Sequence, residues 1–311
     1  MKFLVTGGAG FIGSHIVERL VKEGGDVIVL DNLSTGKMEN LINVINDIDF
    51  IEGDIRDLDL LLSITKGVDY IFHESALTSV IESVENPLRC NEINVNGTLN
   101  VIWASLKNGV KKIIYASSSA VYGDNLILPK KEDMKVEPIS PYAISKYVGE
   151  LYLKFFHDVY NLDIVSLRYF NVYGPRQDPF SPYSAVIPKF ITSLLKDEPP
   201  IIYGDGNQTR DFIFVEDVVS ANILALKKNN LKSKVYNIAG GKKVKIIELY
   251  KLINKILGKN IEPIYAPPRK GEIKDSFADI SLAKNELGFE PKFSLEEGLK
   301  KTIEWYLKIK R

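Results

Sequence analysis

KFLVTGGAGFIGSH, at residues 2–15, joins a short apolar run to a cluster of glycines and then to a helical pattern. Gly8, Gly10 and Gly13 have the GxGxxG spacing, and Gly7 with the last two has the alternative GxxGxxG spacing. Glycines at these points permit a tight turn, a close approach of phosphate groups and close packing of the helix on the strand. The stretch therefore predicts a strand, a turn and a helix whose N-terminus faces a pyrophosphate.

The second predicted strand, DVIVLD at residues 26–31, ends in Asp31, about 20 residues after the glycines, as dinucleotide-binding folds require. A carboxylate there accepts hydrogen bonds from the adenosine ribose and repels a 2′-phosphate, which predicts NAD rather than NADP, although Lys37 nearby would favour the phosphate. Asp54 with Ile55 follows the third strand and is expected beside the adenine, with a merely solvated aspartate as an equal alternative. The residues expected to bind the cofactor are Gly7, Gly10, Phe11, Ile12, Gly13, Asp31, Asn32, Asp54, Ile55, Lys146 and Tyr169.

Short apolar runs alternate with longer amphipathic stretches along most of the chain. Continuous apolar strands separated by helices are typical of a parallel sheet that is covered on both faces. The sequence thus predicts an α/β fold, a doubly wound parallel (Rossmann) sheet with a smaller C-terminal substrate-binding domain. The predicted strands are KFLVTG, DVIVLD, DFIEGD, VDYIFHES, KKIIYASS and DIVSLRYFN, with VYNIAGG at 235–241 returning to the same sheet.

The alternation of strand and helix patterns ends near Gly174, where prolines and loop-forming residues become frequent. Such a segment predicts a smaller unit over the carboxyl edge of the sheet, where ligands of these folds bind. We expect a NAD-binding domain over residues 1–173, with returning segments near 212–240, and a mainly substrate-binding domain over 174–311. The tail carries two amphipathic helical patterns separated by Pro291.

Composition narrows the possible partners and compartments. The chain has 40 basic and 40 acidic residues, so its overall charge indicates neither a nucleic-acid nor a membrane partner. Cys90 is the one cysteine and there are three histidines, which argues against a disulfide and against a metal site. The sequence shows no signal peptide and no apolar run near the ~18 residues that span a bilayer. We therefore expect a soluble cytoplasmic protein.

The stretch SPYAISKYVGE, at residues 140–150, predicts a helix that carries reactive side chains. Ser140 can cap the helix and Pro141 suits its first position, so Tyr142 and Lys146 would project from one face, one turn apart. An ammonium near a phenol favours the phenolate, which makes the tyrosine a better proton acceptor. The pattern alone is weak, because Tyr306 and Lys310 repeat it in the tail.

The serines at the end of KKIIYASS decide between the two tyrosine–lysine pairs. Ser117, Ser118 and Ser119 are delivered to the carboxyl edge of the sheet shortly before the Tyr142 helix, so hydroxyl, phenol and ammonium can converge there. Tyr306 has no such serines before it and is expected to belong to a surface pair. Tyr142 and Lys146 are therefore the predicted catalytic pair.

Six motifs in order along almost the whole chain carry a resemblance to a known family. They are TGGAGFIGS, ASSSAVYG, SPYAISK, LRYFNVYGPRQ, GDGNQTRDFIFVEDV and PPRKGEIKDSFADIS. Together they resemble the extended short-chain dehydrogenase/reductase family, in particular its nucleotide-sugar epimerase branch, which includes the UDP-glucose and UDP-N-acetylglucosamine 4-epimerases. Because six collinear motifs match, the resemblance is far more specific than any single motif.

The resemblance implies roles for particular residues of this chain. Tyr142 would be the base, Lys146 would hold the nicotinamide ribose and lower the tyrosine pKa, and Ser118 would bind the sugar oxygen, with Ser119 as the neighbouring alternative. Forked guanidinium groups suit diphosphate oxygens, in agreement with the arginines among these positions. The residues expected to bind the substrate are Ser118, Ser119, Tyr142, Asn171, Arg210, Arg269, Glu272 and Ser276.

The implied reaction is an epimerisation without net redox change. Tyr142 would remove the proton of the sugar 4-hydroxyl while NAD oxidises C4, and the bound 4-keto sugar would turn over before it is reduced from its other face. The substrates implied are UDP-glucose and UDP-galactose, an activity of galactose metabolism, and the family usually pairs two subunits through helices that here include residues 91–108 and 142–158. A lid-like segment over 174–211 would help to exclude water.

Enzymes of the same fold with other activities carry different residues at these positions. A sugar 4,6-dehydratase carries acidic residues where this chain has Ser119 and Ala120, which argues against dehydration. A uronic acid epimerase or decarboxylase needs a cation for the sugar carboxylate, and Arg176 is a candidate. A non-catalytic, NAD-sensing protein of the same fold is disfavoured by the complete set of Ser118, Tyr142 and Lys146.

Ser276 bears on the breadth of substrates. It lies seven places after Arg269, and in the 4-epimerases the resemblance places that residue beside the sugar's 2-substituent. A bulky tyrosine there is typical of enzymes restricted to UDP-glucose and UDP-galactose, whereas a small residue leaves room for an N-acetyl group. The chain is therefore expected to accept the N-acetylated UDP-hexosamines as well; the alternative is that Ser276 is simply a polar residue before a strand.

Overall fold

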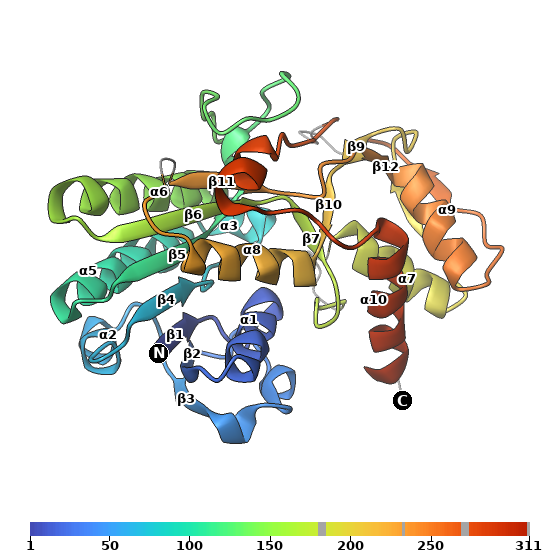
Figure 1. The fold of residues 1–311 in the computed structure, drawn as a ribbon. Coiled ribbons are helices and arrows are strands. Elements are labelled where there is room, and N and C mark those ends of the chain that lie inside the picture. Colours follow the sequence, from blue (N-terminus) through green and yellow to red (C-terminus); the bar gives the residue numbers. More distant parts are fainter. Residues whose placement is uncertain (180–184, 232–233, 269–273, 310–311) are drawn as a thin grey trace.

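A parallel sheet of seven strands forms the centre of the computed structural model, which describes residues 1–179, 185–231, 234–268 and 274–309 (Figure 1). The strand order is β11-β6-β5-β4-β1-β2-β3, and every pairing within it is parallel. All seven runs predicted as strands form this sheet, so the predicted α/β class is confirmed. The strands are β1 (Lys2–Thr6), β2 (Asp26–Asp31), β3 (Ile48–Glu52), β4 (Tyr70–His73), β5 (Lys112–Ser118), β6 (Asp163–Tyr169) and β11 (Val235–Ile238).

Helices cover both faces of the sheet, which is why most of its strands are largely apolar. On one face α1 (Phe11–Lys22) packs against α8 (Val215–Lys227), and on the other α2 (Leu58–Ile64), α5 (Thr98–Asn108) and α6 (Pro141–Tyr160) lie together (Figure 1). Each face therefore has its own apolar core. Among the described residues, every helix is too short or too polar to cross a membrane.

A smaller group of elements lies to one side of the sheet, joined to it through β7 (Asn171–Tyr173) and β10 (Phe212–Phe214), which pair with each other (Figure 1). It has a separate apolar core, built mainly by its helices. Its other elements are α7 (Val186–Leu195), β8 (Ile201–Tyr203), β9 (Thr209–Arg210), β12 (Val244–Lys245), α9 (Ile246–Ile256), β13 (Ile264–Ala266) and α10 (Leu295–Ile309). The division at residue 173 remains our proposal for the domain boundary.

Short helical elements complete the fold. A π-helical turn over Glu92–Gly97 interrupts the long helix expected from residues 91 to 108, and α5 follows it. The first of the two helical patterns in the tail is only a π-helical turn, Ala283–Leu287, which ends at Gly288 with a φ of 75°. The remaining elements are η1 (Met38–Leu41), η2 (Ile45–Asp47), α3 (Val80–Glu85), α4 (Pro87–Asn91) and η4 (Ser119–Tyr122).

Tyr306 is not on the surface, contrary to the expectation from sequence. Its side chain is 3% exposed in the core of the smaller unit, and its hydroxyl donates a hydrogen bond of 2.8 Å to the carbonyl oxygen of Gln177. The apolar face of α10 buries it there, a constraint that the tyrosine–lysine spacing does not reveal. Lys310 lies outside the described residues.

A buried ion pair fixes α6 against the sheet. The Arg168 guanidinium on β6 donates to both carboxylate oxygens of Glu150 on α6, at 2.9 and 2.7 Å, and both side chains are buried. Ser117 on β5 donates to the same carboxylate at 2.5 Å. A forked guanidinium that meets a carboxylate at two points sets orientation as well as distance, so α6 has one position relative to β5 and β6.

Candidate active site

The glycine turn between β1 and α1 leaves no room for side chains. Gly7 has a φ of 69°, and a Cβ atom built on it would lie 2.8 Å from the amide nitrogen of Ser75. A Cβ atom on Gly13 would lie 2.2 Å from the carbonyl oxygen of Gly7. No side chain caps α1 at Gly10, so the first amide groups of this helix are available to a ligand. This cradle fits the pyrophosphate of a dinucleotide.

Asp31 stands beside this cradle at the end of β2. Its carboxylate accepts hydrogen bonds from the amides of Ala9 at 3.0 Å and Leu33 at 2.9 Å, and burial raises its pKa. Lys37 pairs with Asp178 at 3.7 Å, so its ammonium is directed to the smaller unit. The backbone amide of Lys37 also donates to the carbonyl oxygen of Ala9, at 3.0 Å. The arrangement thus places the Asp31 carboxylate at the glycine turn, while the Lys37 ammonium pairs with Asp178.

Asp54 belongs to a small polar network near the same edge. Arg56 binds its carboxylate through Nε at 2.9 Å and Nη2 at 2.8 Å, and this contact lowers the Asp54 pKa to about 2. Asn32 donates to the same carboxylate at 2.9 Å, while Ile55 is buried. The structure thus brings Asn32 and Asp54 together and adds Arg56, which the sequence analysis did not single out.

The predicted catalytic residues meet at the carboxyl end of β5. The Ser118 hydroxyl forms a hydrogen bond with the Tyr142 phenol, and Lys146 lies one turn farther along α6 with its ammonium 2.7 Å from the carbonyl oxygen of Ala116. Ser117 points to the opposite face, toward Glu150, because successive strand residues alternate. Ser119 begins η4. Of the three serines, Ser118 is therefore the one joined to Tyr142.

Burial dominates the electrostatics of this cluster. Burial raises the pKa of Tyr142, while the hydrogen bond from Ser118 opposes that rise. Burial also lowers the pKa of Lys146 to about 8, and its ammonium is directed to the Ala116 carbonyl. Desolvation is the largest influence on the phenol, and the lowering of the tyrosine pKa by Lys146 stays a prediction.

The start of α6 is capped as predicted, and a residue of α3 also binds it. Ser140 accepts a hydrogen bond from the Ala143 amide at 3.2 Å, and Pro141 occupies the first turn. The Tyr142 amide, which the helix itself leaves unpaired, donates to the hydroxyl of Ser83 on α3 at 3.1 Å. The backbone that carries the phenol is therefore fixed on two sides.

Asn94 is a supporting residue that the sequence analysis missed. It lies in the π-helical turn before α5 and bonds the backbone of Leu77 twice, accepting from its amide at 2.7 Å and donating to its carbonyl at 2.9 Å. Its amide also donates to Ser145 on α6 at 3.0 Å. Helical periodicity gave no signal for it, because the π-helical turn shifts the face on which it lies.

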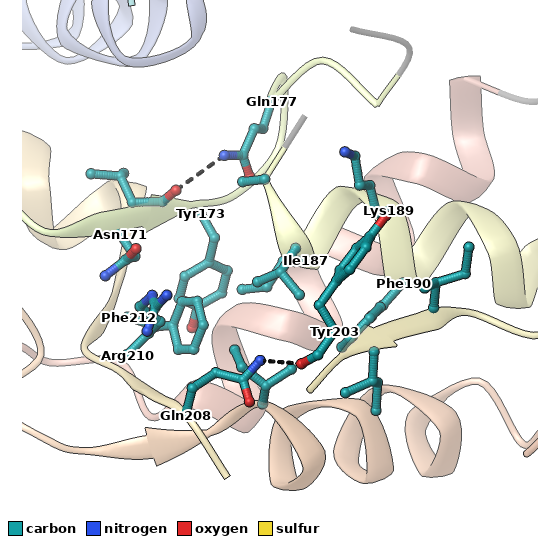
Figure 2. Close-up of a pocket in the computed structure, with 16 residues that line it drawn as sticks. Asn171, Tyr173, Gln177, Ile187, Lys189, Phe190, Tyr203, Gln208, Arg210 and Phe212 are labelled. Carbon is teal, nitrogen blue, oxygen red and sulfur yellow. Dashed lines mark hydrogen bonds between the residues drawn. The ribbon is translucent and has the colours of Figure 1, made fainter. Parts of the chain in front are cut away.

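A cavity of about 320 Å³ opens in the smaller unit beside β7 and β10 (Figure 2). Figure 2 shows Asn171 and Arg210 next to Phe212 at one end, with Tyr203 and Lys189 at the other. Apolar and aromatic walls with a few amide and cationic groups suit a planar polar ring attached to an anion. The lining residues are Asn171, Val172, Tyr173, Gln177, Ala185, Val186, Ile187, Lys189, Phe190, Ile201, Ile202, Tyr203, Gln208, Arg210, Phe212 and Ile246.

Asn171 and Arg210 were predicted from sequence to lie at such a site, but Tyr203, Lys189 and Gln208 were not. Gln208 donates to the Tyr203 carbonyl at 2.7 Å and so shapes the wall from which the phenol projects (Figure 2). Ser276 is half-buried, and its amide donates to the carbonyl of Thr209, next to Arg210, at 3.1 Å. Arg269 and Glu272 lie outside the described residues.

Arg176, the candidate to bind a sugar carboxylate, binds side chains of α1 instead. Its guanidinium forms an ion pair with Glu18 and donates to the Ser14 hydroxyl at 3.2 Å. The neighbouring Pro175 carbonyl lies 3.0 Å from Nε2 of His15 on the same helix. Within the described residues no group of three or more side chains could hold a metal ion.

Comparison with known proteins agrees with this geometry. Residues 3–239 match the model of the NAD dependent epimerase/dehydratase family. The chain is similar to a UDP-N-acetylglucosamine 4-epimerase from Methanobrevibacter ruminantium, solved with UDP-N-acetylmuramic acid, at 47% identity, a TM-score of 0.95 and coverage of 99% of this chain and 98% of that one. It is similar to a UDP-glucose 4-epimerase from Thermotoga maritima, solved with UDP-glucose, at 45% identity, a TM-score of 0.95 and full coverage of both chains.

A third relative acts on a different sugar. The UDP-glucuronate 4-epimerase of Thermodesulfobacterium geofontis is 37% identical over 97% of this chain and 95% of its own length. The relatives therefore share a reaction and a UDP carrier in their names, while the sugar differs from one to the next.

The position of Asp31 predicts the choice of cofactor. We expect the wild-type protein, stripped of nucleotide, to bind NAD at least tenfold more tightly than NADP, a difference of about 1.4 kcal/mol or more. Asp31→Asn removes the charge that repels a 2′-phosphate, so the difference should shrink. Calorimetric titration of both cofactors measures it, with Asp26→Asn, at the exposed start of the same strand, as the matched control. Equal binding of both cofactors by the wild type contradicts the role given to Asp31.

Proposed function

The chain belongs to the NAD dependent epimerase/dehydratase family, within its UDP-sugar 4-epimerases, and on this premise we propose that it interconverts UDP-glucose and UDP-galactose. We also propose that it accepts the N-acetylated UDP-hexosamines. The observation that carries the proposal is the meeting of Ser118, Tyr142 and Lys146 at one edge of the sheet, from which the chain continues through β7 into the wall of a cavity suited to a nucleotide.

In the proposed reaction Tyr142 moves the proton of the sugar hydroxyl. Ser118, hydrogen-bonded to the phenol, is the donor that orients the same sugar oxygen. Lys146, with its pKa near 8, keeps an ammonium at hand to stabilise the phenolate as it forms. NAD, when bound over the glycine turn, supplies reversible oxidation at the sugar carbon.

The cavity beside β7 and β10 is the proposed site of the uridine diphosphate. β6 ends at Tyr169 and β7 begins at Asn171, so the chain passes directly from the reactive edge into the cavity wall. Arg210 brings a guanidinium and Lys189 an ammonium to this cavity, as an anionic diphosphate requires (Figure 2). Tyr203 and Phe212 offer aromatic faces for the base.

Two other functions receive less support. A uronic acid substrate needs a cation for its carboxylate, and Arg176 is occupied by Glu18 and Ser14. A protein that only senses NAD has no need of a serine aligned on a tyrosine, whereas Ser118 and Tyr142 are joined. Neutral sugars therefore fit the described residues best.

We further propose that two copies of the chain pair through α6. Four large apolar side chains lie exposed along one face of this helix: Ile144, Leu151, Phe155 and Val159, between 48% and 57% exposed. A contiguous exposed apolar stripe of this kind is typical of an interface between subunits.

Tyr142→Phe tests the reaction and the base together. Loss of the hydroxyl should lower the rate of 4-epimerisation by about 10² to 10⁴ while NAD binding is kept, because general-base catalysis contributes a factor of that size. A panel of UDP-sugars with product identification measures it. Tyr152→Phe, on the same helix and half-buried, should retain the wild-type rate. A Tyr142→Phe enzyme as fast as the wild type would show that the base has been misassigned.

Ser276→Tyr tests the breadth of substrates. A phenol ring in place of the small side chain should suppress the N-acetyl reaction and spare the reaction on UDP-glucose, because rejection by steric overlap is more decisive than loss of one contact. Rates with the two pairs of UDP-sugars measure the effect. Absence of N-acetyl activity in the wild type, or equal loss of both reactions in the variant, contradicts this role for Ser276.

Phe155→Glu tests the pairing of subunits. A charge in the middle of the apolar stripe should convert the proposed homodimer to monomers, because it would be buried unpaired at the interface. Sedimentation velocity measures the mass of the wild type and the variant. Leu307→Glu alters a comparably exposed apolar residue on α10 and should leave the dimer intact. A monomeric wild type at micromolar concentration rules the proposal out.

A further inference from the structure

Tyr115, on β5, is a buried aromatic residue that contacts the predicted catalytic lysine. Its side chain is 1% exposed, and the ammonium nitrogen of Lys146 lies over its ring, 5.0 Å from the ring centroid. Its hydroxyl donates a hydrogen bond of 3.4 Å to the backbone carbonyl oxygen of Lys146. Tyr115 thus contacts both the side chain and the backbone of the same residue.

The ammonium of Lys146 is held in a place with little access to water. The Lys146 side chain is 3% exposed, and its ammonium donates a hydrogen bond of 2.7 Å to the carbonyl oxygen of Ala116, the residue after Tyr115. An ammonium removed from water needs other partners, and the face of an aromatic ring attracts a cation most strongly where water is excluded. Two consecutive residues of β5 therefore replace part of the hydration of this charge.

The Tyr115 ring belongs to a row of side chains that crosses three neighbouring strands. Thr6 on β1, His73 on β4 and Tyr115 on β5 are partners in the register of the sheet. The two ring nitrogens of His73 lie 2.7 Å from the Thr6 hydroxyl and 2.9 Å from the Thr98 hydroxyl. The His73 and Tyr115 rings stack with their centroids 5.6 Å apart and 29° between their planes. The row begins at the residue before the glycine turn and fixes the Tyr115 ring from the side of β4.

Helix α6 packs closely against the same ring. Gly149 lies about one turn after Lys146 on this helix, and a Cβ atom built on it would lie 2.3 Å from the Tyr115 hydroxyl oxygen and 2.7 Å from Cζ. A residue without a side chain therefore lets the phenol reach the backbone of the helix. Any larger residue at position 149 would displace the ring or the helix.

We propose that Tyr115 is a positioning residue of the active site, whose ring holds the ammonium of Lys146 in place through a cation–π contact. For its consequence in catalysis this inference rests on the proposed function, in which Lys146 is the cation beside Tyr142. The contact itself can be observed without turnover. Phenylalanine can take the same role, because the ring face and not the hydroxyl meets the ammonium, whereas an aliphatic residue cannot.

NMR detects the ring next to Lys146. The full chain is labelled with [ε-¹³C]lysine, and the signal that is missing from Lys146→Met is assigned to Lys146. In the wild type its methylene protons should resonate upfield of those of exposed lysines, because the face of an aromatic ring shields nearby protons. Tyr115→Phe should keep this upfield shift, and Tyr115→Leu should abolish it.

The rate gives a second readout. Tyr115→Leu should lower kcat for 4-epimerisation by about tenfold, the effect expected for loss of one desolvated cation–π contact. The KM for UDP-glucose should stay at the wild-type value, because Tyr115 is not among the residues that line the cavity beside β7 and β10. Tyr115→Phe should retain the wild-type kcat. A residue that only filled space in the core would not produce this separation of kcat from KM together with the NMR shift.

Tyr236→Leu is the matched control. Tyr236 is a fully buried tyrosine on β11 of the same sheet, and its replacement should change neither the Lys146 signal nor kcat. Gly149→Ala, which presses on the ring without removing it, should move the Lys146 signal and serves as the second variant if Tyr115→Leu does not fold.

Three results overturn the proposal: a Lys146 signal at the position of exposed lysines in the wild type, a Tyr115→Leu variant with the wild-type kcat, or a Tyr115→Phe variant as slow as Tyr115→Leu. Failure of Tyr142→Phe to slow the reaction, by contrast, would refute the proposed function and leave the NMR result standing.

Discussion

The parallel pairing of β5 with β6 is the constraint on which the rest of the site depends. Seven residues of each strand are in register, from Lys112 opposite Asp163 to Ser118 opposite Tyr169. Because both strands run in the same direction, their last residues reach the same edge together. Ser118 thereby stands at the reactive cluster, and Tyr169 stands where the chain turns into β7 and the cavity of the smaller unit. A slip of one residue would turn each of these side chains to the opposite face.

The buried ion pair of Glu150 and Arg168 helps to hold this register, although its desolvation is unfavourable. Removing two charges from water costs several kcal/mol for each, and a well-packed apolar pair could be as stable. What the ion pair adds is direction, because the fork of the guanidinium meets both carboxylate oxygens, and Ser117 and Tyr122 occupy further positions around it. We interpret it as a clamp that keeps the helix bearing Tyr142 and Lys146 in one orientation on the sheet.

The sheet and the start of α6 could be predicted from the sequence. The inner strands are largely apolar runs because both faces of the sheet are covered, whereas the edge strand β3 mixes apolar and acidic residues. The start of α6 follows from local chemistry at Ser140 and Pro141. The assignment of Tyr306 to the surface was wrong because periodicity shows that a helix has an apolar face but not which residues it covers. Asn94 and Tyr203 were missed because each owes its place to partners distant in sequence or to a π-helical turn.

The segment around residues 174–178 is tied to both ends of the molecule. His15 and Glu18 hold it to the first helix, and Tyr306, 129 residues after Gln177 in the chain, holds it to the last. During translation the glycine turn and its first partners emerge early, whereas the final tie is made only when α10 is complete. The smaller unit can therefore take its final packing only after the whole of the sheet has been synthesised. This order is set by the connectivity of the chain, independent of any chemistry at the site.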